Sequence, residues 1–167
     1  MTVKYRDAVQ GDLAEIVAIY NSTIPSRMVT ADTAAVTVAS KQPWFEAHCA
    51  KQRPLWIVES ERGVVLAWIS FQSFYGRPAY DATAEISIYI AEQQRGKGLG
   101  KQLLLYSMAQ APTLGIKTIL GFVFAHNIPS LQLFLSLDFE IWGNLPAVAS
   151  IDERDYDLTI LGKRLAV

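Results

Sequence analysis

The chain has 167 residues, of which 51% are hydrophobic and 19% charged, a composition typical of one compact globular unit and unlike that of a disordered chain. A formal net charge of -1 argues against nucleic acid or an anionic membrane as a partner, and a single cysteine, Cys49, excludes an internal disulfide and a CxxC metal or redox motif. Because no secretory signal and no apolar run of the ~20 residues that span a bilayer is visible, we expect one cytoplasmic domain, residues 1–167, without metal.

The N-terminal part of the chain predicts one strand and two helices. Val3–Arg6 alternates briefly and predicts a strand. Asp12–Ser22 places apolar residues at helical spacing behind an aspartate cap, which predicts an amphipathic helix. Residues 23–42 are rich in Thr, Ala and Ser and predict a loop with one helical turn at most. Pro43 is then expected to open a short helix over Trp44–Lys51.

The next segment changes to strand character. Leu55–Glu59 and Val64–Ser73 are rich in β-branched and aromatic residues, and the turn Ser60–Gly63 between them predicts a hairpin. Thr83–Ile90 predicts a further strand, with Glu85 on one face and isoleucines on the other.

The rest of the chain predicts helices alternating with strands. We expect a helix over Gly98–Ala111, a strand over Thr118–Phe124, a helix over Ser130–Leu137, and strands over Phe139–Trp142 and Tyr156–Leu161. The element order predicts an α/β layered fold on a mixed sheet, with antiparallel strands first and a later βαβ crossover.

A glycine-rich loop lies between the strand Thr83–Ile90 and the helix that follows. It runs QQRGKGLGK from Gln93 to Lys101. Glycine permits positive φ and removes the Cβ that keeps a ligand at a distance. Successive N–H groups can then converge on an anion, reinforced by the positive end of the helix dipole. The spacing predicts a site for a pyrophosphate-sized anion held mainly by main chain; the alternative is a flexible turn that merely requires glycine.

Two other phosphate-binding motifs do not fit this loop. A dinucleotide fingerprint needs G-x-G-x-x-G and an acidic residue ~20 positions later, whereas the loop has G-x-G-x-G and the next strand ends at Phe124 without a carboxylate. A Walker loop needs G-x-x-x-x-G-K-S/T, and Ala91 occupies the position of its first glycine.

Arg95, Gly98 and Gly100 match the coenzyme A signature Q/R-x-x-G-x-G/A, and at these residues the chain resembles the GNAT superfamily of N-acetyltransferases. A second segment, HNIPSLQLFLSLDF over residues 126–139, is similar to that superfamily's N-x-x-S-x-x-L-(x)5-F element. The order and spacing of elements resemble the superfamily over essentially the whole chain. The resemblance implies the GNAT fold, a mixed and mostly antiparallel central sheet of six to seven strands flanked by about four helices.

A narrower resemblance is to the phosphinothricin acetyltransferase branch. RPAY at residues 77–80 and TAEISIYI at residues 83–90 are similar to its R-x-A-Y…T-V-E-x-S-V-Y-V run. The branch acetylates amino-acid-like substrates of the phosphinothricin or methionine sulfoximine type and is commonly dimeric. The resemblance therefore implies transfer from acetyl-CoA to a small-molecule amine by a homodimer. NLPAVASIDERD over residues 144–155 departs from the branch's lysine-glycine-tryptophan-aspartate stretch, so phosphinothricin itself stays open as the natural substrate.

The resemblance also assigns residues to acetyl-CoA. The strand before the loop supplies main-chain groups to the pantetheine amides, the loop lines the pyrophosphate, and the segment after residue 126 lies beside the pantetheine arm. The residues so implied are Ile88, Tyr89, Ile90, Arg95, Gly96, Lys97, Gly98, Leu99, Gly100, Lys101, Asn127 and Ser130. Structural interpretations stand beside these: the isoleucines as core, the lysines as solvated charges, and Asn127 or Ser130 as helix caps.

Glu85 is the candidate catalytic base. The acceptor amine must be neutral to attack, so a base or a water chain must remove the proton of an ammonium with a pKa near ~10. Burial in an apolar strand is expected to raise the pKa of Glu85, and the branch carries a glutamate at this position. The alternative is a glutamate facing water. The resemblance further implies that a strand N–H, that of Ile88, holds the oxyanion.

The leaving thiolate has no evident proton donor in the sequence. Phe134 occupies the position where the superfamily usually has a tyrosine, so the thiolate leaves unassisted or is protonated by water. His126, a lone histidine at a strand end, is interpreted as structural. Arg77, Tyr80 and Glu85 are the candidate substrate ligands, the first two for a substrate carboxylate, with Arg27 as a further candidate; a surface arginine is the alternative for each arginine.

Two other functions remain open from the sequence. Phe134 in place of a proton donor is compatible with a non-catalytic acyl-CoA-binding or sensor domain on the same fold. Acetylation of a protein N-terminus or lysine is the other alternative, although no peptide-binding feature is visible.

Overall fold

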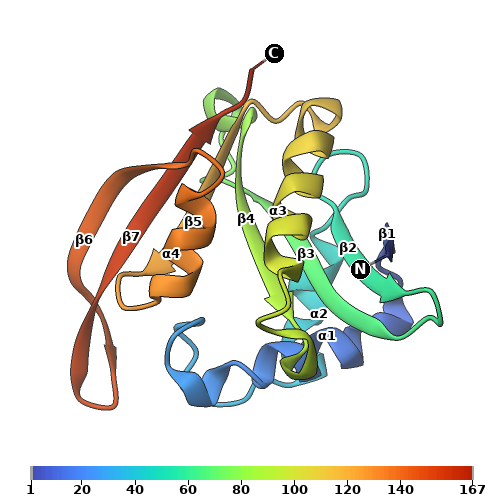
Figure 1. Ribbon diagram of the computed structural model, residues 1–167, viewed down its shortest axis with the longest axis horizontal. Helices are drawn as coiled ribbons and strands as arrows, with labels where there is room; N and C mark the ends of the chain where they lie inside the picture. Colours follow the sequence, from blue (N-terminus) through green and yellow to red (C-terminus); the bar gives the residue numbers. More distant parts are fainter. Residues whose placement is uncertain (1, 167) are drawn as a thin grey trace.

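The computed structural model describes residues 2–166, which form a seven-stranded sheet with four α-helices (Figure 1). The strands are β1 (Val3–Asp7), β2 (Leu55–Ser60), β3 (Val65–Ser73), β4 (Thr83–Ile90), β5 (Thr118–Phe124), β6 (Glu140–Ile151) and β7 (Arg154–Arg164). The helices are α1 (Leu13–Asn21), α2 (Val38–Glu46), α3 (Leu99–Gln110) and α4 (Ile128–Leu135). No helix in the described range is both long and apolar enough to cross a bilayer.

The sheet has the order β1-β2-β3-β4-β5-β7-β6. β1 to β4 are joined as antiparallel neighbours, and β4 pairs in parallel with β5 after the α3 crossover. β5, β7 and β6 are again antiparallel. The predicted mixed sheet, with antiparallel strands first and a βαβ crossover around the glycine-rich loop, is confirmed.

Each face of the sheet carries its own apolar layer. On one face, α3 buries Leu103 and Leu104 and α4 buries Phe134 in a core shared with the strands. On the other face, α1 buries Ile16 and Ile19, and α2 packs an aromatic side chain against the same cluster. The sheet is therefore covered by two different pairs of helices, one pair on each face. A cavity lies beside each pair.

β4 connects the two layers because its side chains alternate. Its three isoleucines face the core formed with α3 and α4, whereas Glu85, Ser87 and Tyr89 line a cavity under α1 and α2. This alternation was predicted from the period of two along the strand.

The predicted position of α2 was wrong. The sequence pattern placed a helix over Trp44–Lys51 that began at Pro43, whereas α2 starts at Val38 and Pro43 lies inside it. The start is set by Thr37, whose hydroxyl accepts a hydrogen bond from the Ser40 amide at 3.0 Å, while the Ser40 hydroxyl accepts one from the Thr37 amide at 3.1 Å. This reciprocal cap lies in the segment that was predicted to be a loop.

The C-terminal strands are longer than predicted. The patterns Phe139–Trp142 and Tyr156–Leu161 marked only parts of β6 and β7, which form a long hairpin closed by Asp152 and Glu153, both at positive φ. β6 is one of the two edge strands and is mostly exposed, so its residues lack the alternating apolar pattern that identifies a strand. Pairing with β7, rather than local preference, holds it extended.

The start of α4 also differs from the prediction. The helix was expected over Ser130–Leu137, but it begins at Ile128 because the Asn127 side chain caps it by accepting a hydrogen bond from the Ser130 amide at 3.3 Å. α3 agrees with the prediction to within one residue at each end, with Gly98 as its N-cap.

Candidate active site

The site is organised by a gap between two parallel strands. β4 and β5 pair only through Thr83–Glu85 and Thr118–Leu120. Beyond these residues β4 continues to Ile90, but its pairing with β5 has ended. Glu85 therefore lies where the two strands begin to separate.

Main-chain amides of β4 point into this gap. The Ala82 carbonyl, on the side of β5, accepts bonds from Lys117 and Thr118, whereas the Ala91 amide bonds to β3 at 2.8 Å. Because hydrogen-bonding groups alternate along a strand, even-numbered residues of β4 present their N–H groups to β5. The amides of Ile88 and Ile90 thus face the gap, past the last paired residue.

The glycine-rich loop is shaped by its glycines in two ways. Gly96 and Gly98 have φ values of 73° and 79°, in the region that favours glycine. Gly100, in the first turn of α3, packs closely against α4, because an added Cβ would be 3.1 Å from Cδ2 of Leu133 and would require that side chain to shift. The N-terminal amides of α3 consequently open onto a cleft, as an anion site requires.

This cofactor cleft has a volume of about 400 Å³. Among the residues predicted to bind acetyl-CoA, those that line it are Ile88, Tyr89, Ile90, Arg95, Gly96, Gly98, Gly100, Lys101 and Ser130. Three predicted residues do not line it. Lys97 is exposed and lies within 3.4 Å of Gln94 Oε1, and the Leu99 side chain is buried in the core. Asn127 lies farther along the gap.

Arg95 braces the loop. Its guanidinium donates to the Ile90 carbonyl at 3.0 Å and to the Ser22 hydroxyl at 2.8 Å. It therefore ties the loop to the end of β4 and to the end of α1. Arg95, the first residue of the coenzyme A signature, therefore holds the loop in place in addition to any contact with a ligand.

A narrower cavity of about 160 Å³ continues from the cleft into the gap between β4 and β5. Asn127 lines it but is occupied: besides capping α4, it donates from Nδ2 to the Met28 carbonyl at 3.1 Å. Phe134 also lines it, with its ring against Gly121 of β5. The phenylalanine supplies an apolar wall and no proton.

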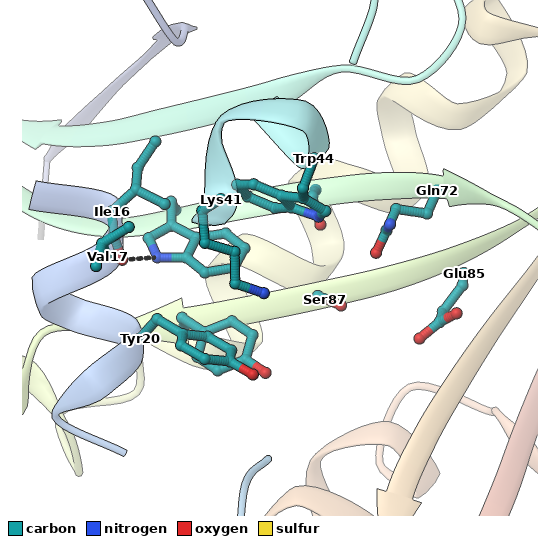
Figure 2. A pocket seen from close by; sticks show the side chains of 11 residues that line it. Ile16, Val17, Tyr20, Lys41, Trp44, Gln72, Glu85 and Ser87 are labelled. Carbon is teal, nitrogen blue, oxygen red and sulfur yellow. Dashed lines mark hydrogen bonds between the residues drawn. The ribbon is translucent and has the colours of Figure 1, made fainter. Parts of the chain in front are cut away.

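The acceptor cavity, about 310 Å³, lies on the opposite face of the sheet between α1, α2 and strands β3 and β4 (Figure 2). It is lined by Ile16, Val17, Tyr20, Lys41, Trp44, Trp68, Ser70, Gln72, Glu85, Ser87 and Tyr89. Tyr89 also lines the cofactor cleft, and Ser87 also lines the narrower cavity. The cavities on the two faces of the sheet therefore lie against the same part of β4, just beyond Glu85.

Burial shifts the pKa values of one carboxylate and two phenols in the lining of the acceptor cavity. It raises the pKa of Glu85 above the ordinary value for glutamate. Burial, with a hydrogen bond to Asp32, raises the pKa of Tyr20 to about 12, and burial also raises the pKa of Tyr89. Both tyrosines are hydrogen-bonding phenols at neutral pH, so Glu85 is the group in the lining that is suited to accept a proton.

Several other candidates lie away from this cavity. Arg77 and Tyr80 lie in the connection between β3 and β4, where Tyr80 packs edge-on against Phe74 at 5.5 Å, and neither lines the cavity. Arg27 forms an ion pair with Asp152 at 2.8 Å. His126 contacts the Arg27 carbonyl at 2.8 Å through Nε2, which agrees with its interpretation as structural.

Sequence reasoning missed most of the acceptor cavity. Tyr20 was assigned only to an amphipathic helix. Trp44 and Trp68 belong to an aromatic-rich stretch that was expected to be mostly core, with some members in a wall of the acceptor pocket or a subunit interface, and neither tryptophan was singled out. Lys41 fell in the predicted loop because α2 was placed too late. The reciprocal cap of Thr37 and Ser40 was the signal that could have located this helix and its lysine. Among residues 2–166, no three His, Cys, Asp or Glu side chains gather as metal ligands.

Known proteins are similar to this chain in sequence. The chain matches the Acetyltransferase (GNAT) family model over residues 16–139. It is 53% identical to the "Putative phosphinothricin acetyltransferase YwnH" of Bacillus subtilis, over 96% of this chain and 98% of that protein. It is 32% identical to the L-methionine sulfoximine/L-methionine sulfone acetyltransferase of Pseudomonas aeruginosa, over 96% of this chain and 94% of that protein.

A solved structure with the co-substrate bound is also similar. The crystal structure of a GNAT superfamily phosphinothricin acetyltransferase from Sinorhizobium meliloti in complex with acetyl-CoA aligns with a TM-score of 0.91 at 28% identity, over 99% of this chain and 90% of that one. The chain therefore belongs to the GNAT acetyltransferase family, in its phosphinothricin and methionine sulfoximine acetyltransferase-like branch, and is an acetyl-CoA-dependent N-acetyltransferase.

Proposed function

We propose that residues 1–167 act as one catalytic domain that acetylates the amine of a small amino-acid-like substrate, with Glu85 as the general base. The observation that carries the proposal is the meeting of two cavities at β4: the cofactor cleft and the acceptor cavity share Tyr89, and Glu85 lies where β4 and β5 separate. An acceptor cavity of about 310 Å³ is the size of a small-molecule site.

The cofactor cleft fits acetyl-CoA. The positive-φ glycines and the N-terminus of α3 provide main-chain N–H groups for a pyrophosphate. The missing Cβ of Gly100 leaves space beside α4. In this arrangement, main-chain groups at the edge of β4 form hydrogen bonds with the pantetheine amides. Lys101 adds positive charge to the cleft, and Ser130 lines it. Lys97, Leu99 and Asn127 contribute through main chain or through loop and helix geometry.

Glu85 accepts the proton that the acceptor amine must lose. Bound acetyl-CoA supplies an electrophilic acyl carbon and a thiolate leaving group. The amide of Ile88 faces the gap and donates a hydrogen bond to the oxygen on which negative charge develops. Since burial raises the pKa of Glu85, its carboxylate is a stronger base than that of an exposed glutamate.

Release of the thiolate needs no protein acid in this proposal. Phe134 cannot donate a proton, and burial raises the pKa values of the Tyr20 and Tyr89 phenols, which makes both weaker acids. Water donates the proton to the thiolate instead. The rate of thiolate release is therefore expected to depend on the stability of the thiolate and not on a proton donated from position 134.

The names of relatives support the substrate class. Similar proteins act on L-methionine sulfoximine and L-methionine sulfone, and another is an L-amino acid N-acyltransferase from Escherichia coli. We infer an amino-acid-like acceptor whose amine lies at Glu85. Arg77 and Tyr80 lie at the β3–β4 connection, beyond the Glu85 end of the cavity, and can contact only an acceptor that extends out of it.

A homodimer is part of the proposal. The edge strand β6 exposes a group of large apolar side chains, which is unusual for a monomer surface. These are Ile141, Trp142, Leu145 and Val148. Analytical ultracentrifugation of the wild type and of a Trp142→Asp variant tests it: a wild-type monomer would contradict the dimer without affecting the catalytic proposal.

A thiol-release assay tests the function. Purified chain with acetyl-CoA should acetylate L-methionine sulfone, L-methionine sulfoximine or phosphinothricin faster than simple alkyl amines. Glu85→Gln should lower kcat by roughly 10²–10⁴-fold while acetyl-CoA binding, measured by calorimetry, is retained. Glu61→Gln removes an exposed carboxylate in the β2–β3 turn and serves as the matched control. Full activity of Glu85→Gln would refute its role as base.

A further inference from the structure

The acceptor cavity contains a lysine ammonium that neither the sequence pattern nor the proposed chemistry uses. Lys41 projects from α2 toward the cavity (Figure 2). Its Nζ lies 4.7 Å from the ring centroid of Tyr20 and 5.7 Å from that of Trp44. Two aromatic faces therefore fix the position of the charge.

This ammonium lacks a protein counter-ion. Among residues 2–166, no carboxylate forms a salt bridge with Lys41 and no side chain or carbonyl accepts a hydrogen bond from its Nζ. The one carboxylate in the cavity lining is Glu85. Figure 2 shows the two side chains toward opposite ends of the cavity, with Ser87 between them. A partly desolvated cation without a partner favours an anion brought by the ligand.

The position of the cation along β4 indicates which part of an acceptor it meets. Lys41 lies over Tyr20, whose ring is 5.1 Å from that of Tyr89. Tyr89 is four residues beyond Glu85, so the Cα atoms of these two residues are about 13 Å apart along the strand. In an α-amino acid the carboxylate is attached to the carbon that carries the amine, so it stays close to Glu85. The group that reaches Lys41 must lie farther along the side chain.

We propose that Lys41 is a specificity residue that binds an anionic group on the acceptor's side chain, remote from the amine that is acetylated. The proposal rests on the proposed function, because it takes the amine to lie at Glu85. It narrows the substrate class to amino acids whose side chain ends in an acidic group, such as a phosphinate or a carboxylate, and it assigns the selection to charge rather than to shape.

A purely structural role for Lys41 is less consistent with its surroundings. The Tyr20 hydroxyl is already hydrogen-bonded to Thr30 and Asp32, so it does not need the lysine. Trp44 packs edge-on against Trp68 at 5.4 Å, which holds α2 to the sheet without the lysine. The ammonium is therefore the part of Lys41 whose role the packing leaves unexplained.

Two acceptors of similar shape and different charge test the proposal. Phosphinothricin carries an anionic phosphinate at the end of its side chain, whereas L-methionine sulfone carries a neutral tetrahedral sulfone. Lys41→Met should lower kcat/KM for phosphinothricin by about 10- to 100-fold, chiefly through KM, because a charge-assisted hydrogen bond is lost. The same variant should change kcat/KM for methionine sulfone by less than about threefold. Lys41→Arg should retain the preference, and Lys51→Met, an exposed lysine outside the cavity, should behave as wild type.

The outcomes separate this proposal from the proposed function. If Lys41→Met affects both acceptors equally, or neither, or if wild type acetylates only the sulfone, Lys41 does not read a side-chain anion. If wild type acetylates no amine at all, the proposed function fails. Calorimetric titration of both acceptors into wild type and Lys41→Met then still tests the lysine: tighter binding of phosphinothricin that depends on Lys41 supports the proposal, and charge-independent binding overturns it.

Discussion

Gly121→Ala should be markedly more damaging than an alanine at another glycine of the same sheet. Gly121 lies in β5, and a Cβ added there would be 2.8 Å from Cε1 and 2.9 Å from Cζ of Phe134. Phe134 is itself only 8% exposed and packs edge-on against Phe139 at 4.9 Å. The ring therefore has little space to move, except toward the cavity between β4 and β5.

The magnitude follows from opposing terms. Replacing a strand glycine by alanine stabilises by about 0.4–1 kcal/mol where the conformation permits, because the unfolded chain loses entropy. Overpacking of a filled core costs about 1–3 kcal/mol. Gly143→Ala is the matched control, since its added Cβ would meet Ile160 no closer than 3.5 Å, an ordinary contact. The free energy of unfolding should thus be lower for Gly121→Ala than for Gly143→Ala by about 1–3 kcal/mol.

Urea unfolding of the two variants and calorimetry with coenzyme A provide the assays. If the Phe134 ring moves into the gap to relieve the overlap, coenzyme A should also bind more weakly to Gly121→Ala. Adding Phe134→Leu should recover part of the loss, with a coupling of about 0.5–3 kcal/mol between the two sites. Equal unfolding midpoints for the two alanine variants, or additive effects in the double variant, would refute the packing argument.

Below neutral pH, kcat/KM should fall as Glu85 is protonated, with a midpoint above the ordinary glutamate value of ~4.3 because burial raises its pKa; a pH–rate profile that keeps this limb in Glu85→Gln would contradict the assignment. Gly98→Ala, at φ 79°, should destabilise the fold by about 1–2 kcal/mol and raise the KM for acetyl-CoA, whereas Gly11→Ala, with no atom within 4 Å of its added Cβ, should do neither in unfolding and kinetic assays. Arg6 holds the pKa of Asp12 below its usual value, so the stability from this carboxylate is present at neutral pH and is lost as pH falls through the depressed pKa. Unfolding midpoints of wild type and Asp12→Asn should therefore differ at pH 7 and begin to converge as the pH falls below about 4. A difference that stays constant with pH would exclude a contribution of Asp12 ionisation to stability.

The glycine-rich loop and the strand before it were largely predictable from the sequence because the information that specifies them is local. The glycines at 96 and 98 are required by the backbone of their own loop, and Glu85 is distinguished by its position in an apolar strand. Such features depend on residues that are neighbours along the chain. The alternation of β4, which places Glu85 and the isoleucines on opposite faces, follows from strand geometry alone.

The acceptor side was not predictable because its residues come from elements far apart in the sequence. Tyr20, Lys41 and Trp44 are brought to β3 and β4 only by the packing of α1 and α2 on the sheet. Local patterns cannot give this packing, and the late placement of α2 hid the lysine. For the same reason Arg77 and Tyr80, conspicuous in the sequence, lie outside the cavity lining.

The sequence by itself determined the element order, the glycine-rich loop and the half-buried carboxylate of Glu85 on its strand, since each is set by the conformational preferences of a short segment. Tertiary structure alone decided that β4 and β5 separate beyond Glu85, that β6 extends along β7, and that a lysine faces the acceptor cavity. These features arise from pairing and packing between distant segments, whose free energy depends on contacts that no local window of sequence contains.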